Sequence, residues 1–281
     1  MNFFEKLKQS CNKRQSLLCI GLDPRCELKE IVSQNTALIK QTAEYAACYK
    51  PNIAFYEAFG AEGLNALTET IQLIPGDIPI LLDAKRNDIG ATAEAYARGV
   101  FDHLKADAVT LNPYMGRSSA EPFLKYTDHG LFFLCRTSNP GAEKLQTLPV
   151  GATGEPFYRK VARECFSWRS DAGLVVAGND PDTLGELREM LPDTWFLAPG
   201  IGAQGGSMRE AVESGLAADG YGILPVVVRG IANADDPAVT AKEYRDTINL
   251  VRESRGITWG SDLNHDFGIF MIVFLQYYNE K

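Results

Sequence analysis

The sequence predicts an α/β protein with the (β/α)8 TIM-barrel fold, formed by residues 1–281 as a single domain. Short apolar segments alternate with amphipathic segments eight times, an alternation that is typical of a parallel sheet covered by helices. Each repeat is about 25 to 35 residues long, as expected for successive βα units, and no linker interrupts the series. No GxGxxG motif follows the first apolar segment. A closed barrel is therefore favoured over a doubly wound sheet, which usually has fewer strands and a Gly-rich first turn.

The eight candidate strands are short runs of mainly aliphatic and aromatic residues, which is typical of strands buried on both faces. In chain order they span residues 17–23, 49–56, 79–85, 108–114, 131–138, 173–178, 195–200 and 225–230. Between them, apolar residues recur at helical spacing. After the third strand, Ala93, Tyr96 and Val100 form such a stripe, and Asp88 is the expected N-cap of this helix.

Both ends of the chain are expected to pack on the barrel. An N-terminal helix containing Phe3, Phe4 and Leu7 is expected to close the bottom of the barrel. From about residue 256 the sequence departs from the βα pattern, and we interpret this part as a C-terminal extension. Its apolar run, residues 267–278, is shorter than the stretch of about 20 residues that crosses a bilayer, so no membrane partner is expected.

Composition and charge exclude several classes of function. The net charge of -8 and the absence of a Lys/Arg-rich run argue against nucleic-acid binding, because phosphate backbones favour a basic surface. The six cysteines have no CxxC spacing, so the sequence predicts neither a zinc site nor a redox dithiol. The N-terminus lacks the apolar core of a signal peptide. A cytoplasmic protein with free thiols is therefore expected.

The third candidate strand ends in an unusual concentration of charge, "PILLDAKRNDIGAT". Asp83 and Lys85 are two residues apart, so on a regular strand they leave the same face with Cα atoms roughly 7 Å apart. Functional residues of such barrels lie at the C-terminal ends of the strands. The polar residues at the other strand ends are Asp23, Lys50, Asn112, Ser138, Gly200 and Arg229. We expect all of these side chains to meet at one mouth of the barrel.

The pattern of charges has two possible interpretations. One is an ion-pair network, and the other is a site for Mg²⁺ between Asp83 and Asp88. Lys85, which lies between the two acids in the sequence, favours the ion pairs. The three histidines, at positions 103, 129 and 265, do not form a ligand set, so no metal is predicted. A glycine-rich segment, "PGIGAQGG", follows the seventh strand and Arg229 follows the eighth, where barrels commonly bind phosphate.

The segment "DAKRNDIGAT" resembles the D-x-K-x-x-D-I-x-x-T signature of the orotidine 5'-phosphate decarboxylase family. Five further segments resemble that family, namely "LCIGLDPR", "YKPNIAFYE", "RTSNPGA", "PGIGAQGG" and "VVVRGI". Of these, "RTSNPGA" and "PGIGAQGG" resemble its longer bacterial-type branch. The resemblance implies decarboxylation of orotidine 5'-phosphate to UMP and CO₂ without a cofactor. It implies catalytic roles for Lys85, Asp83, Asp88 and Lys50, and substrate contacts by Asp23, Ile89, Thr92, Ser138, Gln204, Gly205 and Arg229.

The resemblance also implies a homodimer in which Asp88 and Thr92 complete the site of the partner subunit. Residues 139–158, which are long for a connection and rich in Gly and Pro, are expected to fold over the base of the nucleotide. Two alternatives stay open. One is a sugar-phosphate lyase on the same barrel, using Mg²⁺ or a Schiff base at Lys85. The other is a non-catalytic nucleotide-binding paralogue, although such a protein would be expected to have lost a catalytic charge.

Overall fold

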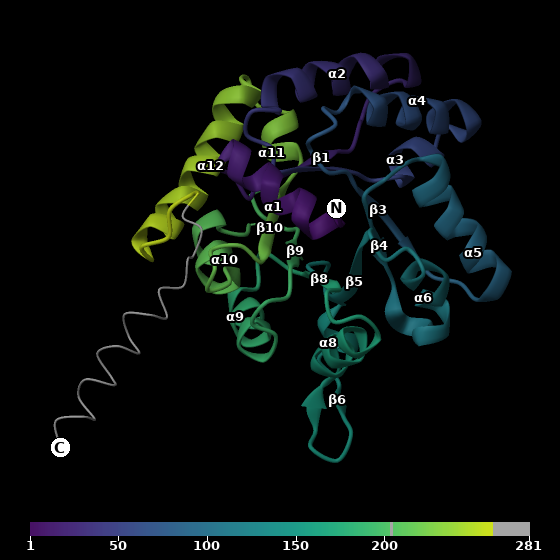
Figure 1. Cartoon of the computed structure of the whole chain (residues 1–281), viewed down its shortest axis with the longest axis vertical. Coiled ribbons are helices and arrows are strands. Elements are labelled where there is room, and N and C mark those ends of the chain that lie inside the picture. Colours follow the sequence, from purple (N-terminus) through teal and green to yellow (C-terminus); the bar gives the residue numbers. More distant parts are fainter. Residues whose placement is uncertain (203–204, 261–281) are drawn as a thin grey trace.

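The computed structural model describes residues 1–202 and 205–260, and these form a nearly closed barrel of eight parallel strands surrounded by helices (Figure 1). The strand order is β2-β1-β10-β9-β8-β5-β4-β3, and every neighbouring pair is parallel. The predicted TIM-barrel fold is confirmed. In the described part of the chain no helix is long and apolar enough to cross a membrane.

The eight barrel strands lie within or close to the predicted ranges. They are β1 (Cys19–Leu22), β2 (Cys48–Pro51), β3 (Leu81–Arg86), β4 (Ala108–Leu111), β5 (Gly130–Arg136), β8 (Gly173–Val176), β9 (Phe196–Ala198) and β10 (Ile223–Val227). Their central residues are almost fully buried, because each strand packs against side chains in the barrel interior and against the helices outside. This explains why the sequence shows continuous apolar runs at these positions.

All predicted strands except the third extend too far at their C-terminal ends, by one to five residues, and the reason is clear for the second and the eighth. Residues 53–56 turn away from the sheet, because the Asn52 side chain accepts a hydrogen bond from the Ala54 amide (3.2 Å) and a short helix follows. The eighth strand ends at Val227, and Arg229 is the first residue of a helix instead of the last part of a strand. In both places a polar residue leaves the sheet at the mouth of the barrel.

The helices cover the outside of the barrel. The longer ones are α1 (Phe3–Arg14), α2 (Ile31–Thr42), α4 (Gly60–Leu73), α5 (Gly90–Arg98), α6 (Arg117–Leu124), α8 (Phe157–Trp168), α9 (Pro181–Met190), α10 (Met208–Gly215) and α12 (Pro237–Ser254). Short helices are α3 (Ala54–Glu57), α7 (Glu143–Gln146), α11 (Arg229–Ala232), the 3-10 turns η1 (Leu28–Glu30) and η3 (Pro113–Met115), and the π-helix η2 (Gly99–His103). A hairpin of β6 (Pro149–Val150) and β7 (Glu155–Pro156) projects beyond α8 (Figure 1).

Helix α1 lies across the N-terminal end of the barrel, as the sequence predicts. Its Phe3 ring meets Phe132 of β5 edge to face at 5.9 Å, and the Phe3 amide donates to the Asp128 carbonyl. Lys6 forms a salt bridge with Asp107, which precedes β4. The bottom of the barrel is therefore closed by a packed helix, and the opposite end remains the open mouth.

The barrel closes between β2 and β3 through two isolated bridges in the described structure, Tyr49 with Ile80 and Asn52 with Asp83. The Tyr49 amide donates to the Pro79 carbonyl and the Ile53 amide donates to the Asp83 carbonyl. Some neighbouring strands share longer registers, such as the four paired positions of β1 and β2, whereas β1 with β10 and β8 with β9 pair at two consecutive positions each. At the β2–β3 seam the two bridges are isolated and do not form a continuous ladder.

The beginning of the predicted C-terminal extension folds back on α12. The Trp259 ring stacks on the Arg252 guanidinium, with 3.6 Å between the charge and the ring centre, and its Nε1 donates to Asn249. The expected packing of the apolar run at 267–278 lies outside the described residues, as does His265.

Candidate active site

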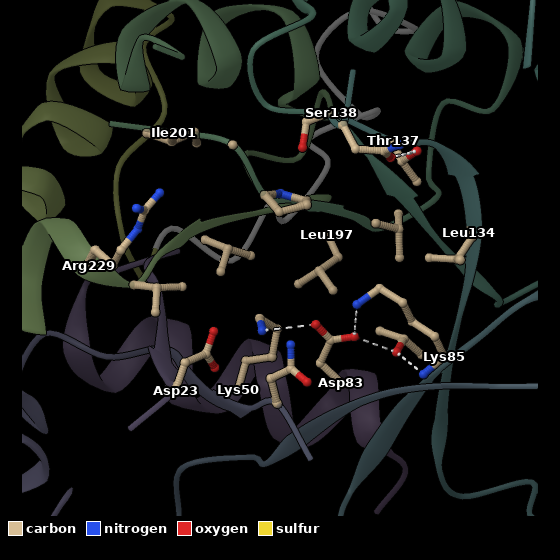
Figure 2. A pocket seen from close by; sticks show the side chains of 18 of the residues that line it. Asp23, Lys50, Asp83, Lys85, Leu134, Thr137, Ser138, Leu197, Ile201 and Arg229 are labelled. Carbon is tan, nitrogen blue, oxygen red and sulfur yellow. Dashed lines mark hydrogen bonds and ion pairs between the residues drawn. The ribbon is translucent and has the colours of Figure 1, made fainter. Parts of the chain in front are cut away.

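The mouth of the barrel contains a cavity of about 420 Å³ (Figure 2). Its floor is apolar and is formed by side chains that β5, β8, β9 and β10 contribute, namely Leu134, Val175, Leu197 and Val226. The predicted site residues that line it are Asp23, Lys50, Asp83, Lys85, Ser138, Gly200 and Arg229. Strand ends far apart in the sequence therefore converge on one cavity.

The cavity contains a cation–carboxylate–cation array. Asp83 Oδ1 accepts a hydrogen bond from Lys85 Nζ at 2.6 Å, and Asp83 Oδ2 accepts one from Lys50 Nζ at 3.3 Å (Figure 2). The Lys50 and Asp83 side chains are 4% and 11% exposed, whereas that of Lys85 is 48% exposed. The array therefore presents one accessible ammonium group to the cavity, backed by a buried carboxylate and a buried ammonium.

Burial and charge act in opposite directions on the two buried members of the array. Burial alone would raise the pKa of Asp83, but the charges of Lys50 and Lys85 outweigh it and hold that pKa well below its usual range. For Lys50, burial lowers the pKa, and the nearby carboxylates of Asp83 and Asp23 more than reverse this, so the net pKa is raised. Asp83 is thus ionised and Lys50 is protonated at neutral pH.

Asp23, which follows β1, lies on the other side of Lys50. Burial raises the pKa of its carboxyl group, against the lowering effect of Lys50. Its Oδ1 atom is buried and has no hydrogen-bond partner in the described structure. Because a buried polar atom without a partner is costly, Asp23 is suited to receive a donor such as a hydroxyl group from a ligand in the cavity.

We expected a regular strand to present Asp83 and Lys85 on one face, but strand β3 is irregular at these residues. The register with β4 shifts between Leu82 and Arg86, and Lys85 has a left-handed backbone with φ of +46°. Such a conformation costs a non-glycine residue on the order of 1–3 kcal/mol and occurs preferentially at functional sites. The two side chains enter the same cavity, as predicted, but they do so from a bulge and not from a regular strand.

The structure places Asp88, Ile89 and Thr92 outside the lining of the cavity. Ile89 is 55% exposed and Thr92 is also exposed. The prediction that Asp88 caps the following helix is wrong: α5 begins at Gly90, its N-cap is Ile89, and the Asp88 carboxylate accepts from the Ile89 amide instead. These three side chains therefore form part of the outer surface beside the mouth.

The predicted phosphate-binding residues are only partly brought to the cavity. Arg229 and Gly200 line it, and Arg229 lies on the side opposite Lys85 (Figure 2). Gly205 does not line it, and its amide donates to the Gly202 carbonyl within a turn where both glycines have positive φ angles. Gln204 lies outside the described residues. Asn112 accepts from the Tyr114 amide and faces a different hollow.

Sequence reasoning missed several residues that line the cavity, namely Arg25, Asn52, Thr110, Thr137 and Gln146. Gln146 holds the segment after β5, since its Oε1 accepts from the Thr137 amide and its Nε2 donates to the Thr137 hydroxyl. Residues 139–158, which we expected to fold over the base, contain α7 and the β6–β7 hairpin. The signal for Thr110 was available: it is the one polar residue of a buried strand, and such a hydroxyl needs partners.

Fold and cavity together define a TIM-barrel protein whose charged site lies at the C-terminal ends of the strands. Residues 16–244 match the model of the orotidine 5'-phosphate decarboxylase / HUMPS family. The chain belongs to this family.

Relatives of the chain agree in sequence and structure. The orotidine 5'-phosphate decarboxylase of Thermomicrobium roseum is 45% identical over 272 residues, which cover 90% of this chain and 97% of the relative. The solved structure of Leishmania donovani OMP decarboxylase has a TM-score of 0.85 and 47% identity, and the match covers 90% of this chain and 99% of that one. Leishmania donovani UMP synthase gives a TM-score of 0.86 at 49% identity, but this chain spans 57% of its length.

Proposed function

We propose that the protein decarboxylates orotidine 5'-phosphate to UMP and CO₂, a step of pyrimidine biosynthesis. The observation that carries this proposal is the Lys50–Asp83–Lys85 array in the cavity of a chain that belongs to the decarboxylase family. An accessible ammonium group held against a buried carboxylate is the arrangement that this reaction needs.

The reaction leaves a negative charge on a carbon atom of the pyrimidine ring. When the bond between C6 and the carboxylate breaks, its electron pair stays on C6 and CO₂ departs. No carbonyl group is positioned to delocalise that pair, so stabilisation must come from the protein. The Lys85 ammonium provides a preorganised positive charge and then transfers a proton to C6. The 2.6 Å contact with Asp83 supports this role, because it holds Lys85 oriented.

Asp83 and Lys50 prepare Lys85 for this step. Lys50 keeps the buried Asp83 carboxylate ionised and favours the charged form of its partner, while Asp83 raises the pKa of Lys50; the same carboxylate accepts the hydrogen bond that orients Lys85. The Asp83 carboxylate also lies close to the position of the substrate carboxylate, and their repulsion is relieved when CO₂ leaves. We rank stabilisation of the carbanion above this effect.

The rest of the nucleotide is recognised away from Lys85. Asp23, with its unpartnered buried oxygen, accepts from the ribose, and Ser138 contacts the pyrimidine. Arg229, with Gln204 and Gly205, binds the phosphate. Binding energy from this remote group contributes to the chemical step if it helps to exclude water from the site.

The site is completed by a second copy of the chain in a homodimer. Asp88 and Thr92 act in the partner's site, together with Ile89. None of the three lines the cavity of its own chain, Ile89 and Thr92 are exposed, and Asp88 is half-buried, which supports this arrangement because residues that act in their own chain would be expected to face its cavity. The cytoplasm is the expected compartment, and the six free thiols of the described region support it.

Neither alternative is favoured by the geometry. A Schiff base needs an unprotonated lysine, whereas Lys85 is ion-paired with Asp83. A magnesium site at Asp83 would compete with two ammonium groups and the Thr110 hydroxyl for the same carboxylate. A non-catalytic paralogue is disfavoured because all of the predicted charges are present.

The test is a spectrophotometric assay of orotidine 5'-phosphate consumption in metal-free buffer. We expect full turnover with EDTA present and no trapping of the protein by borohydride. Turnover that disappears with EDTA and returns with Mg²⁺ would contradict the proposed mechanism. Binding of UMP without turnover of orotidine 5'-phosphate would instead support the non-catalytic alternative.

A further inference from the structure

Strand β3 bulges next to a single residue of β4. Leu82 pairs with Val109 and Arg86 pairs with Leu111, so Asp83, Ala84 and Lys85 all stand opposite Thr110. Three residues facing one cannot all keep ladder hydrogen bonds, and a bulge of this kind leaves backbone groups in need of other partners. The catalytic candidates Asp83 and Lys85 lie in the bulge itself.

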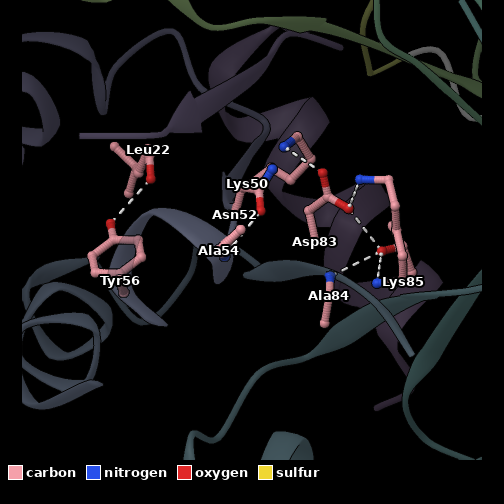
Figure 3. Close-up of polar contacts among 9 residues, drawn as sticks. Leu22, Lys50, Asn52, Ala54, Tyr56, Asp83, Ala84 and Lys85 are labelled. Carbon is pink, nitrogen blue, oxygen red and sulfur yellow. Dashed lines mark hydrogen bonds and ion pairs between the residues drawn. The ribbon is translucent and has the colours of Figure 1, made fainter. Parts of the chain in front are cut away.

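The Thr110 hydroxyl supplies these partners. Its Oγ1 accepts from the Ala84 amide at 3.0 Å and from the Lys85 amide at 2.9 Å, and it lies 2.9 Å from Asp83 Oδ1. Figure 3 shows the three partners Asp83, Ala84 and Lys85 close together. Because amides only donate, both lone pairs of the hydroxyl are used, and its one proton points to the carboxylate. Thr110 is 1% exposed, so water does not replace any of these bonds.

These contacts fix Lys85 at both ends. Its amide is bound to Thr110 Oγ1, its Nζ is bound to Asp83 Oδ1, and the same Asp83 oxygen accepts the Thr110 proton. The closed ring of hydrogen bonds spans a residue whose φ of +46° is unfavourable for a side chain such as lysine. The hydroxyl therefore compensates the left-handed conformation that directs the ammonium group into the cavity.

We infer that Thr110 is a positioning residue for decarboxylation, which holds the bulge of β3 and thereby aims the Lys85 ammonium at the reacting carbon. The inference rests on the proposed function, because it assigns Thr110 its effect on the chemical step. Thr110 acts through Lys85 and Asp83 and makes no bond to the reacting atoms.

Removing a positioning hydroxyl and removing a merely structural hydroxyl have different effects on the rate. A hydroxyl that only satisfied buried amides would lower stability on removal and leave the rate per folded molecule unchanged. A positioning hydroxyl lowers kcat, because misplacing a catalytic group by about 1 Å can reduce the rate on the order of 100-fold. It leaves KM nearly unchanged, since ribose and phosphate contacts lie elsewhere in the cavity.

The test compares Thr110→Val, Thr110→Ser and a matched control, Thr42→Val. Thr42 is also fully buried, and its hydroxyl contacts the Leu38 carbonyl and the Tyr49 hydroxyl, each at 2.7 Å, outside the cavity. Steady-state kinetics with orotidine 5'-phosphate, calorimetric binding of UMP and thermal unfolding are measured for each protein. A crystal structure of Thr110→Val gives the φ angle of Lys85.

We expect Thr110→Val to lower kcat on the order of 100-fold, with KM and the Kd of UMP within about threefold of wild type. Thr110→Ser should recover most of the rate, and Thr42→Val should lower Tm without lowering kcat. If Thr110→Val does not fold, Thr110→Ala is used in its place, and failure of both to fold would overturn the inference in favour of a structural role.

A wild-type kcat in Thr110→Val would also overturn the inference, as would an equal loss in Thr42→Val. Absence of turnover in the wild type would refute the proposed function separately. In that case the crystal structure of Thr110→Val tests whether Thr110 positions Lys85. A φ angle of Lys85 outside the left-handed region supports this, and an unchanged φ angle with an unchanged contact to Asp83 refutes it.

Discussion

Lys50 and Lys85 bind the same carboxylate, yet we expect their replacement by methionine to affect stability very differently. Methionine keeps most of the length of lysine and removes the charge. Lys50 is 4% exposed, so Lys50→Met leaves the buried carboxylates of Asp83 and Asp23 without their buried counter-charge. Breaking a buried pair in this way costs about 3–5 kcal/mol.

Lys85→Met is the matched case with an accessible ammonium. The Lys85 side chain is 48% exposed, so solvent screens its pair with Asp83, and exposed pairs contribute about 1 kcal/mol or less. Asp83 also keeps Lys50 and Thr110 as partners in this variant. At about 2 °C per kcal/mol for a chain of this size, Lys50→Met should lower Tm by roughly 6–10 °C and Lys85→Met by roughly 2 °C or less.

Differential scanning calorimetry of the two variants at neutral pH measures this difference, and orotidine 5'-phosphate turnover is assayed on the same preparations. Both variants should lose turnover, and Lys85→Met should still bind UMP. Equal shifts of Tm in the two variants would refute the reasoning from burial. Wild-type turnover in Lys85→Met would remove this lysine from the mechanism.

Three further predictions concern the remaining charges. Arg229→Ala should lower kcat/KM by an amount equivalent to about 2–5 kcal/mol, because the phosphate loses its charged partner. In the wild type, free phosphite dianion should partly restore turnover of a substrate that lacks the phosphate. If phosphite has no effect, the phosphate only anchors the substrate. Mixing inactive Lys85→Ala and Asp88→Ala subunits should restore roughly a quarter of wild-type activity, because about half of the dimers are hybrids and each hybrid has one intact site. If activity does not recover although the subunits demonstrably exchange, Asp88 acts in the site of its own subunit. The lowered pKa of Asp83 means that its native-state pairing stabilises the protein fully above the ordinary carboxyl pKa of about 4 and is lost as pH falls through the lower folded value. Tm of the wild type should therefore fall more steeply below about pH 4 than Tm of Asp83→Asn, and parallel Tm profiles would contradict the lowered pKa.

The sequence was sufficient to predict the barrel and most of the cavity, because both follow from patterns that are local in the chain. Continuous apolar runs mark the strands, and a charge at the end of such a run must lie at the mouth. Asp23, Lys50, Asp83, Lys85, Ser138 and Arg229 all line the cavity for this reason.

Features that depend on contacts between strands could not be predicted in the same way. The bulge of β3 exists because Thr110 of the neighbouring strand binds two of its amides, and nothing in "LLDAKR" alone indicates a left-handed lysine. The early end of β2 results from a turn at Asn52, which resembles a strand residue in the apolar run around it. Gln146 could not be predicted because its side chain contacts the Thr137 amide only when the segment between them folds back, and no motif in the sequence marks this contact.

The closure of the barrel between β2 and β3 makes the geometry of the site depend on local opening of the native state. Because its two bridges are isolated and form no continuous ladder, this seam is a place where local opening of the barrel is expected to require little free energy. The Lys50–Asp83 pair crosses the same seam, so any opening separates the two charges. Because the array on which the proposed reaction depends is then broken, molecules that are open there are expected to be inactive. Amide hydrogen exchange at Tyr49 and Ile53 therefore measures the fraction of molecules that is momentarily unable to react.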